Sequence, residues 1–283
     1  MNINPFIVIS KEQRNSIEKK IRDFCKDNEI INPKLKNKKG KKHKTRKRTP
    51  LELYDLLSKN KDVAFEIARL YQIEICPYCN ENYAYVCISE NNDGSEKKVF
   101  RPDFDHYYCK SKGASKALKV YNLIPSCQVC NSRIKGQNSN DRAEHYHPFF
   151  DNLFADFDFV VDVFSANYVD DFNIDTVVKN SLVHRYSFKE YRKKDDYERA
   201  KKTIEFFYLK ERANYHKQEI SSILSIAANN SIQRILNLQN VIDQKDIIKA
   251  VFPYYECDIK KTSLGKLKKD VTEYVLKKMG IIK

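Results

Sequence analysis

Two Cys-x-x-Cys pairs constrain the fold of this 283-residue chain more than any other feature. Cys76-Pro-Tyr-Cys79 and Cys127-Gln-Val-Cys130 each present two thiolates from a tight turn, and four thiolates form the ligand set of a closed tetrahedral zinc site. The alternatives are a redox-active pair, which needs one Cys-x-x-Cys and a thioredoxin-like setting, and four unrelated buried thiols. We therefore predict a structural Zn²⁺ site that closes a loop of 47 residues.

The other four cysteines have no metal-ligand spacing, and we predict packed thiols at Cys25, Cys87, Cys109 and Cys257. The stretch MNINPFIVISKEQRN lacks a basic segment followed by a long apolar one, so we do not expect the disulfides of a secreted protein. The chain also has no run of 18 or more apolar residues. We expect a soluble, cytoplasmic protein that makes no membrane contact.

Positive charge is concentrated in one segment. Lys and Arg number 52 against 38 Asp and Glu, and ten of the basic residues lie between Lys34 and Arg48, where no acidic residue occurs. A segment without apolar residues to bury is expected to stay solvated until it meets phosphate, although a solubilising or targeting tail has the same composition. We assign nucleic-acid contacts to the residues in its second half: Lys41, Lys42, Lys44, Arg46, Lys47 and Arg48.

Helix and strand signals follow one another along the chain. Ser10-x-x-Gln13 resembles a capping box at the start of an amphipathic helix over about 10–27, and Thr49-Pro50-Leu51-Glu52 marks a second helix start. That helical stretch is predicted to break near Asn60 and to reach Tyr71. Strand and helix patterns predict the remaining elements: a hairpin over 82–101, strands at 102–108, 157–164 and 172–178, and helices beyond 197, including 231–242, 244–252 and 263–278.

These elements predict an α+β protein in three parts. An N-terminal helix and basic arm (1–48) precede a central domain (49–150), and a mainly helical C-terminal region (151–283) follows. The central domain contains both cysteine pairs, so the loop that the metal closes lies inside it. We therefore expect a sizeable folded segment between the two pairs.

An Asp-His pair lies inside that loop. Asp105-His106 occurs in PDFDHYY, Asn122 in YNLIPSC, and Asn131 directly after the second cysteine pair in CQVCNSRIKG. In this order and spacing, these residues resemble the HNH branch of the His-metal finger nucleases over about residues 76–150. The third letter of the family motif is Asn here, and Cys109 stands where related sequences often have proline. Neither change removes a required chemical group.

The resemblance implies a zinc-braced ββα-metal finger. A two-stranded hairpin would carry Asp105 and His106, a loop would carry Asn122, and a following helix would carry Asn131. Neutral His106 would take a proton from the attacking water, Asp105 and Asn131 would ligate Mg²⁺ or Mn²⁺ through oxygen, and Asn122 would brace the loop and orient His106. The alternative is a packed His106 hydrogen-bonded to Asp105.

Residues next to these landmarks have weaker signals. Lys135 lies one helical turn beyond Asn131, where it would either contact a phosphate or be solvated on the helix surface. Asp103 lies two residues before Asp105 and hence on the same strand face, so we predict it as a spare metal ligand. For His145 and His147 in EHYHPF we favour a structural or phosphate-contacting role, because an HPF tripeptide follows the finger in many related sequences.

The arrangement CPYC…DHYYCKS…NLIPSCQVCN…HPF is most similar to stand-alone HNH proteins of bacterial anti-phage systems, such as the nuclease subunits of Septu and of related retron systems. The resemblance implies a metal-dependent endonuclease, acting on DNA, beside an ATPase partner that docks on the helical C-terminal region. The alternatives are a ribonuclease that cuts structured RNA such as tRNA, and a non-catalytic zinc-knuckle protein that only binds nucleic acid. A homing or restriction enzyme would need sequence-reading elements, and no helix-turn-helix is recognisable.

Overall fold

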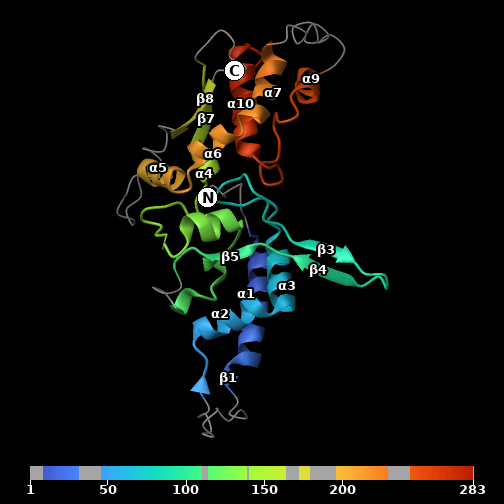
Figure 1. The fold of residues 1–283 in the computed structure, drawn as a ribbon, viewed down its shortest axis with the longest axis vertical. Coiled ribbons are helices and arrows are strands. Elements are labelled where there is room, and N and C mark those ends of the chain that lie inside the picture. The colour runs from blue at the N-terminus through green and yellow to red at the C-terminus, as the bar shows by residue number, and fades with distance from the viewer. Residues whose placement is uncertain are drawn as a thin grey trace. The chain divides into compact units, whose positions relative to one another are not determined.

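The computed structural model describes residues 9–31, 46–109, 114–138, 140–163, 172–178, 196–228 and 243–282 (Figure 1). The described chain is α+β, with helices and four separate two-stranded antiparallel sheets. It divides into an N-terminal unit (7–77 and 83–141) and a C-terminal unit (1–6, 78–82 and 142–283). This division differs from the predicted three parts, because the N-terminal helix packs in the same unit as the helices that follow it. No described helix combines the length and hydrophobicity that a bilayer crossing requires.

Capping residues start the helices of the N-terminal unit where the sequence predicts them. Ser10 and Gln13 form a reciprocal capping box, and so do Thr49 and Glu52. Asn60 ends one helix, and its side chain caps the next, which explains the predicted break. The helices are α1 (Lys11–Asn28), α2 (Pro50–Lys59) and α3 (Lys61–Tyr71). The apolar face of α1 packs against α3, which lies beside it in Figure 1.

The strands of this unit are short antiparallel pairs: β1 (Ile30–Ile31) with β2 (Arg46–Lys47), β3 (Cys87–Glu90) with β4 (Glu96–Phe100), and β5 (Asp103–His106) with β6 (Leu123–Ser126). The predicted hairpin is present, but β3 begins at Cys87, later than expected. Tyr83 makes only an isolated bridge to Ile75, so the stretch between them is a turn. Gly94 supplies the positive φ of +79° that the hairpin turn needs.

A strand, a second strand and a helix follow one another around the predicted site. After the one-turn segments η1 (Ala114–Lys116) and η2 (Val120–Asn122), β6 pairs with β5, placing Asp105 opposite Ile124. The π-helical segment η3 (Val129–Lys135) comes next and contacts β5. The Asn131 carbonyl accepts the Gly136 N–H at 2.8 Å, and Gly136 ends the helix with a φ of +52°.

The described end of the predicted basic arm is engaged with acidic and backbone groups. Arg46 forms a two-fold contact with Glu52, and Lys47 pairs with Glu29. The Arg48 guanidinium donates to the carbonyls of Asn28 and Ile30. The side chains of Arg46 and Lys47 remain exposed to solvent, so these contacts are surface ion pairs and leave the predicted nucleic-acid role of the two residues a prediction. The other assigned residues lie outside the described residues: Lys41, Lys42 and Lys44.

The C-terminal unit combines one two-stranded sheet with helices: β7 (Phe157–Val163) pairs with β8 (Phe172–Val178), and the helices are α4 (Leu153–Asp156), α5 (Asp196–Phe206), α6 (Leu209–Tyr215), α7 (Lys217–Ala228), α9 (Gln244–Val251) and α10 (Gly265–Lys278). Both strands occur where predicted. Helix α10 packs on β7 and α7, and α6 packs on β8. The helix predicted at 231–242 lies outside the described residues.

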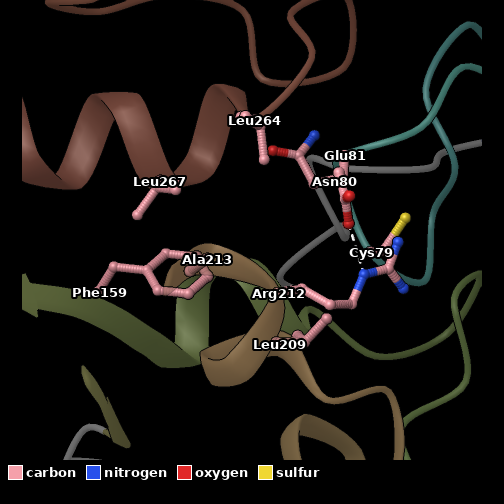
Figure 2. A pocket seen from close by; sticks show the side chains of 9 residues that line it. All are labelled: Cys79, Asn80, Glu81, Phe159, Leu209, Arg212, Ala213, Leu264 and Leu267. Atoms are coloured by element: carbon pink, nitrogen blue, oxygen red, sulfur yellow. Dashed lines mark hydrogen bonds and ion pairs between the residues drawn. The ribbon is translucent and has the colours of Figure 1, made fainter. Parts of the chain in front are cut away.

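Buried polar contacts fasten this unit internally. The Lys266 ammonium contacts Asp270 at 2.7 Å and Asp158 at 3.0 Å, and the Phe159 N–H donates to Asp270 at 2.8 Å. The Asn80 side chain accepts from the Lys266 N–H at 2.6 Å. Figure 2 shows Asn80 and its neighbour Glu81 lining a cavity near α10, where Glu81 pairs with Arg212 of α6.

Candidate metal centre and active site

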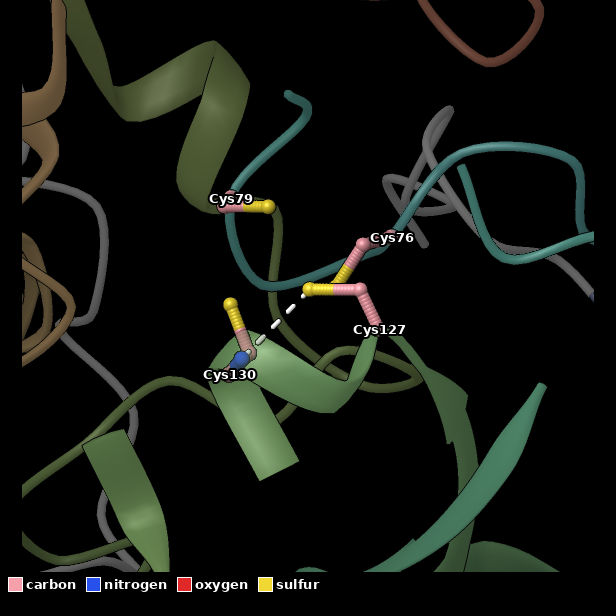
Figure 3. Close-up of side chains that lie close together, drawn as sticks. All are labelled: Cys76, Cys79, Cys127 and Cys130. Atoms are coloured by element: carbon pink, nitrogen blue, oxygen red, sulfur yellow. Dashed lines mark hydrogen bonds between the residues drawn. The ribbon is translucent and has the colours of Figure 1, made fainter. Parts of the chain in front are cut away.

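The four cysteines of the two Cys-x-x-Cys pairs form one cluster, called the four-cysteine cluster below. Their sulfur atoms all lie within 4.8 Å of one another, and all four residues are buried: Cys76, Cys79, Cys127 and Cys130. Figure 3 shows the thiols converging from two segments of chain. Four thiolates about 2.3 Å from Zn²⁺ lie roughly 3.8 Å apart, so a contraction of up to about 1 Å closes the cluster on a metal. The cluster can hold a metal such as zinc, as the spacing predicts.

The second cysteine pair joins β6 to η3. Cys127 directly follows β6, and the Cys130 N–H donates to the Cys127 sulfur at 3.4 Å. Asn131 is the next residue on the helix. A metal held here fixes the start of the helix that carries Asn131. Among the described residues, no other group of three or more His, Cys, Asp or Glu is arranged to hold a metal.

Asp105 and His106 lie at the end of β5, and both side chains are buried. Asp105 is 2% exposed, and its Oδ1 accepts from the Lys135 ammonium at 2.8 Å. The same ammonium donates to the His106 carbonyl. Lys135 itself is 2% exposed. The predicted surface role of Lys135, with a phosphate or with solvent, is therefore wrong, because its side chain turns inward to a buried carboxylate.

The ring of His106 is held by groups that the sequence did not reveal. Its Nε2 lies 3.0 Å from the Ala117 carbonyl, and the Tyr54 ring packs edge-on at 4.3 Å between centroids. A carbonyl only accepts hydrogen bonds, so Nε2 carries the proton, and Nδ1 is the atom of the neutral ring that accepts one. Burial raises the pKa of Tyr54 to about 12.

Asn122 is fully buried at the end of η2. Its side-chain oxygen accepts from the Tyr108 N–H at 2.7 Å, and its amide donates to the carbonyls of Tyr108 and Lys116, at 3.2 and 3.1 Å. Lys116 precedes Ala117, whose carbonyl holds His106. Asn122 therefore ties the chain just after His106 to the segment whose carbonyl holds the histidine ring, and its influence on the ring passes through the backbone.

Asn131 and Asp103 face each other across η3 and β5. The Asn131 amide donates to Asp103 Oδ2 at 3.3 Å. Asp103, predicted as a spare ligand, is thus the carboxylate that contacts Asn131, whereas Asp105 contacts Lys135. Carboxylate and amide oxygens are hard donors of the kind that Mg²⁺ and Mn²⁺ prefer, so the chemistry of Asp103, Asp105 and Asn131 is compatible with such an ion.

The HPF stretch has structural contacts. His147 is fully buried, its Nδ1 accepts from the Phe149 N–H at 3.1 Å, and its own N–H donates to Asp151 at 2.7 Å. Arg142 and Arg199 also bind Asp151. Burial opposes ionisation of Asp151, but the two guanidinium groups outweigh it and lower the pKa of its carboxyl. The structural alternative for His147 therefore matches its surroundings.

Sequence reasoning missed Tyr54, the Ala117 carbonyl and the inward turn of Lys135. Tyr54 reads as an ordinary core position of α2, a backbone carbonyl has no side-chain signature, and the partner of Lys135 lies thirty residues away in the sequence. No local signal marks any of the three.

No protein-family model matches the chain, and neither a curated protein nor a solved structure is significantly similar to it.

Proposed function

We propose that this protein is a metal-dependent endonuclease that hydrolyses phosphodiester bonds in nucleic acid, with DNA as its substrate. The main support is the surroundings of His106. The Ala117 carbonyl fixes the ring of His106, and the buried Asp105 precedes His106 on β5. Asp103 of the same strand contacts Asn131 of η3, so β5, β6 and η3 together form a strand–strand–helix arrangement around the histidine. A metal bound by the four-cysteine cluster would brace the start of the helix.

Hydrolysis of a phosphodiester needs a base for the attacking water, positive charge at the scissile phosphate and stabilisation of the leaving oxygen. His106 is the base, and it accepts the proton at Nδ1 because Nε2–H is committed to Ala117. Asp105, Asn131 and Asp103 would hold Mg²⁺ or Mn²⁺. When bound, the ion would supply the positive charge that the phosphate and the leaving oxygen need.

The distribution of charge supports a polyanionic substrate. The N-terminal unit, which contains His106, carries 28 Lys and Arg against 16 Asp and Glu, whereas the C-terminal unit carries 24 against 22. A net positive unit attracts phosphate backbones without reading their sequence, and its binding weakens as salt rises. Nothing at Asp105 or His106 distinguishes ribose from deoxyribose, so RNA has to be tested as a second substrate beside DNA.

The cleavage test uses zinc-loaded protein, plasmid DNA and bulk tRNA, with and without Mg²⁺ or Mn²⁺, and denaturing gels. His106→Ala should lower the cleavage rate by about 100-fold or more, the usual contribution of a general base. His216→Ala is the matched control, since it removes a partly exposed imidazole of the C-terminal unit. Nucleic-acid binding without metal-dependent cleavage, both by the isolated wild-type chain and by the complex copurified from its native host, would support the non-catalytic alternative instead.

We also propose, from the resemblance to anti-phage nucleases, that an ATPase partner gates the activity by docking on the C-terminal unit. Copurification of an ATPase with the tagged full chain from its native host, before or during infection, would support this. Cleavage should then depend on the copurifying complex. Retrieval of no ATPase under either condition would contradict it and leave the nuclease proposal standing.

A further inference from the structure

Lys135 and Asp105 form a buried ion pair at the centre of the candidate site. Both side chains are 2% exposed, the ammonium lies 2.8 Å from Oδ1 of Asp105, and it also donates to the His106 carbonyl. The positive charge thus touches both residues of the Asp-His pair. A buried carboxylate without a cation is strongly unfavourable, so the ammonium neutralises Asp105 within the chain.

We propose that Lys135 is a positioning residue that takes the place of the divalent ion, holding Asp105 in the metal-free chain and giving way when metal binds. This inference rests on the proposed function, in which Asp105 is a metal ligand. Two cations that share one buried carboxylate repel each other. The affinity of the site for metal is therefore lower than its oxygen donors alone would give.

The position of Lys135 in the helix makes this exchange feasible. It is the last residue of η3, and the Gly136 N–H closes the wide helical turn on the Asn131 carbonyl. Gly136 has a φ of +52°, a conformation that favours glycine, so the helix ends directly behind the lysine. The long side chain can therefore leave Asp105 by rotating its own torsions, without unwinding the turn that carries Asn131.

A purely structural ion pair predicts the opposite response to mutation. If Lys135 only held the fold together, its removal would loosen the site and weaken metal binding. If it occupies the place of the metal, removal takes the Lys135 ammonium away from the buried Asp105 carboxylate, and a divalent ion no longer competes with that ammonium. The sign of the change in affinity separates the two roles.

The test measures Mn²⁺ binding to the zinc-loaded full chain through the electron paramagnetic resonance signal of free Mn²⁺. Lys135→Met keeps the length and apolar stem of the side chain, and we expect it to bind Mn²⁺ about tenfold more tightly than wild type. Mutations next to metal ligands typically change affinity by about this factor, and here the change is a gain because the variant removes a competing cation. Mn²⁺ should also raise the Tm of the variant more than that of wild type. Equal or weaker binding by the variant overturns the inference while the proposed function stands. Binding by neither protein overturns both.

A second measurement needs no variant. Acylation of wild-type lysines, followed by mass spectrometry with and without saturating Mn²⁺, reports whether Lys135 leaves its buried position. Lys266 is the matched control, because it too is buried and paired with an aspartate, Asp270. We expect Mn²⁺ to raise the labelling of Lys135 several-fold and to leave Lys266 protected. Unchanged labelling of Lys135 at saturating Mn²⁺ overturns the inference.

Discussion

Removal of the metal from the four-cysteine cluster should destabilise the protein severely. The cluster joins two knuckles separated by 47 residues, and a cross-link that closes a loop of about 50 residues removes roughly 4 kcal/mol of chain entropy from the unfolded state. Single domains are typically stable by only about 5–15 kcal/mol. The metal should therefore contribute a large fraction of the free energy of unfolding.

The assay compares two serine variants of the full chain by denaturant unfolding and zinc content. Cys130→Ser removes one buried ligand, and we expect it to lose its zinc and to lower the free energy of unfolding by about 4 kcal/mol. Cys87→Ser makes the same chemical change at a partly buried thiol outside the cluster and should keep its zinc. Stable folding of wild type after complete chelation, at an unchanged denaturant midpoint, would refute the reasoning.

Two further predictions follow from buried polar groups. Burial raises the pKa of Asp270 to about 7, so the folded chain binds a proton more tightly than the unfolded chain, and this stability is lost as pH rises from about 4 to 7. This difference in the pKa of Asp270 corresponds to about 4 kcal/mol of stability. Asp270→Asn should therefore flatten the dependence of Tm on pH between about 4 and 7, and an unchanged dependence would contradict the raised pKa of Asp270. Asn122→Ala leaves three backbone groups without their partner and should lower the free energy of unfolding by about 2–4 kcal/mol and slow cleavage, whereas Asn91→Ala in the exposed hairpin turn should do neither.

Local interactions explain which elements the sequence predicts well. Capping boxes at Ser10 and Thr49 act between residues three positions apart, so the helix starts follow directly from the residues. Alternating apolar residues likewise define β7 and β8. The sequence pattern predicts the hairpin start too early, because the β-forming residues near Tyr83 pair only once, with Ile75. Residue type alone does not say which strand a segment will find.

The four-cysteine cluster is predictable from local sequence, since each Cys-x-x-Cys already brings two thiols together and only the joining of the two pairs depends on the fold. The order of Asp105, His106, Asn122 and Asn131 along the chain is likewise evident from the sequence. The partners of these residues follow only from the three-dimensional fold. Asn131 contacts Asp103, and the Lys135 ammonium is buried against Asp105. Both contacts form because η3 packs on β5, which brings the two carboxylates within reach of the helix side chains. Whether a lysine is solvated or buried depends on such a distant partner, which no local pattern encodes.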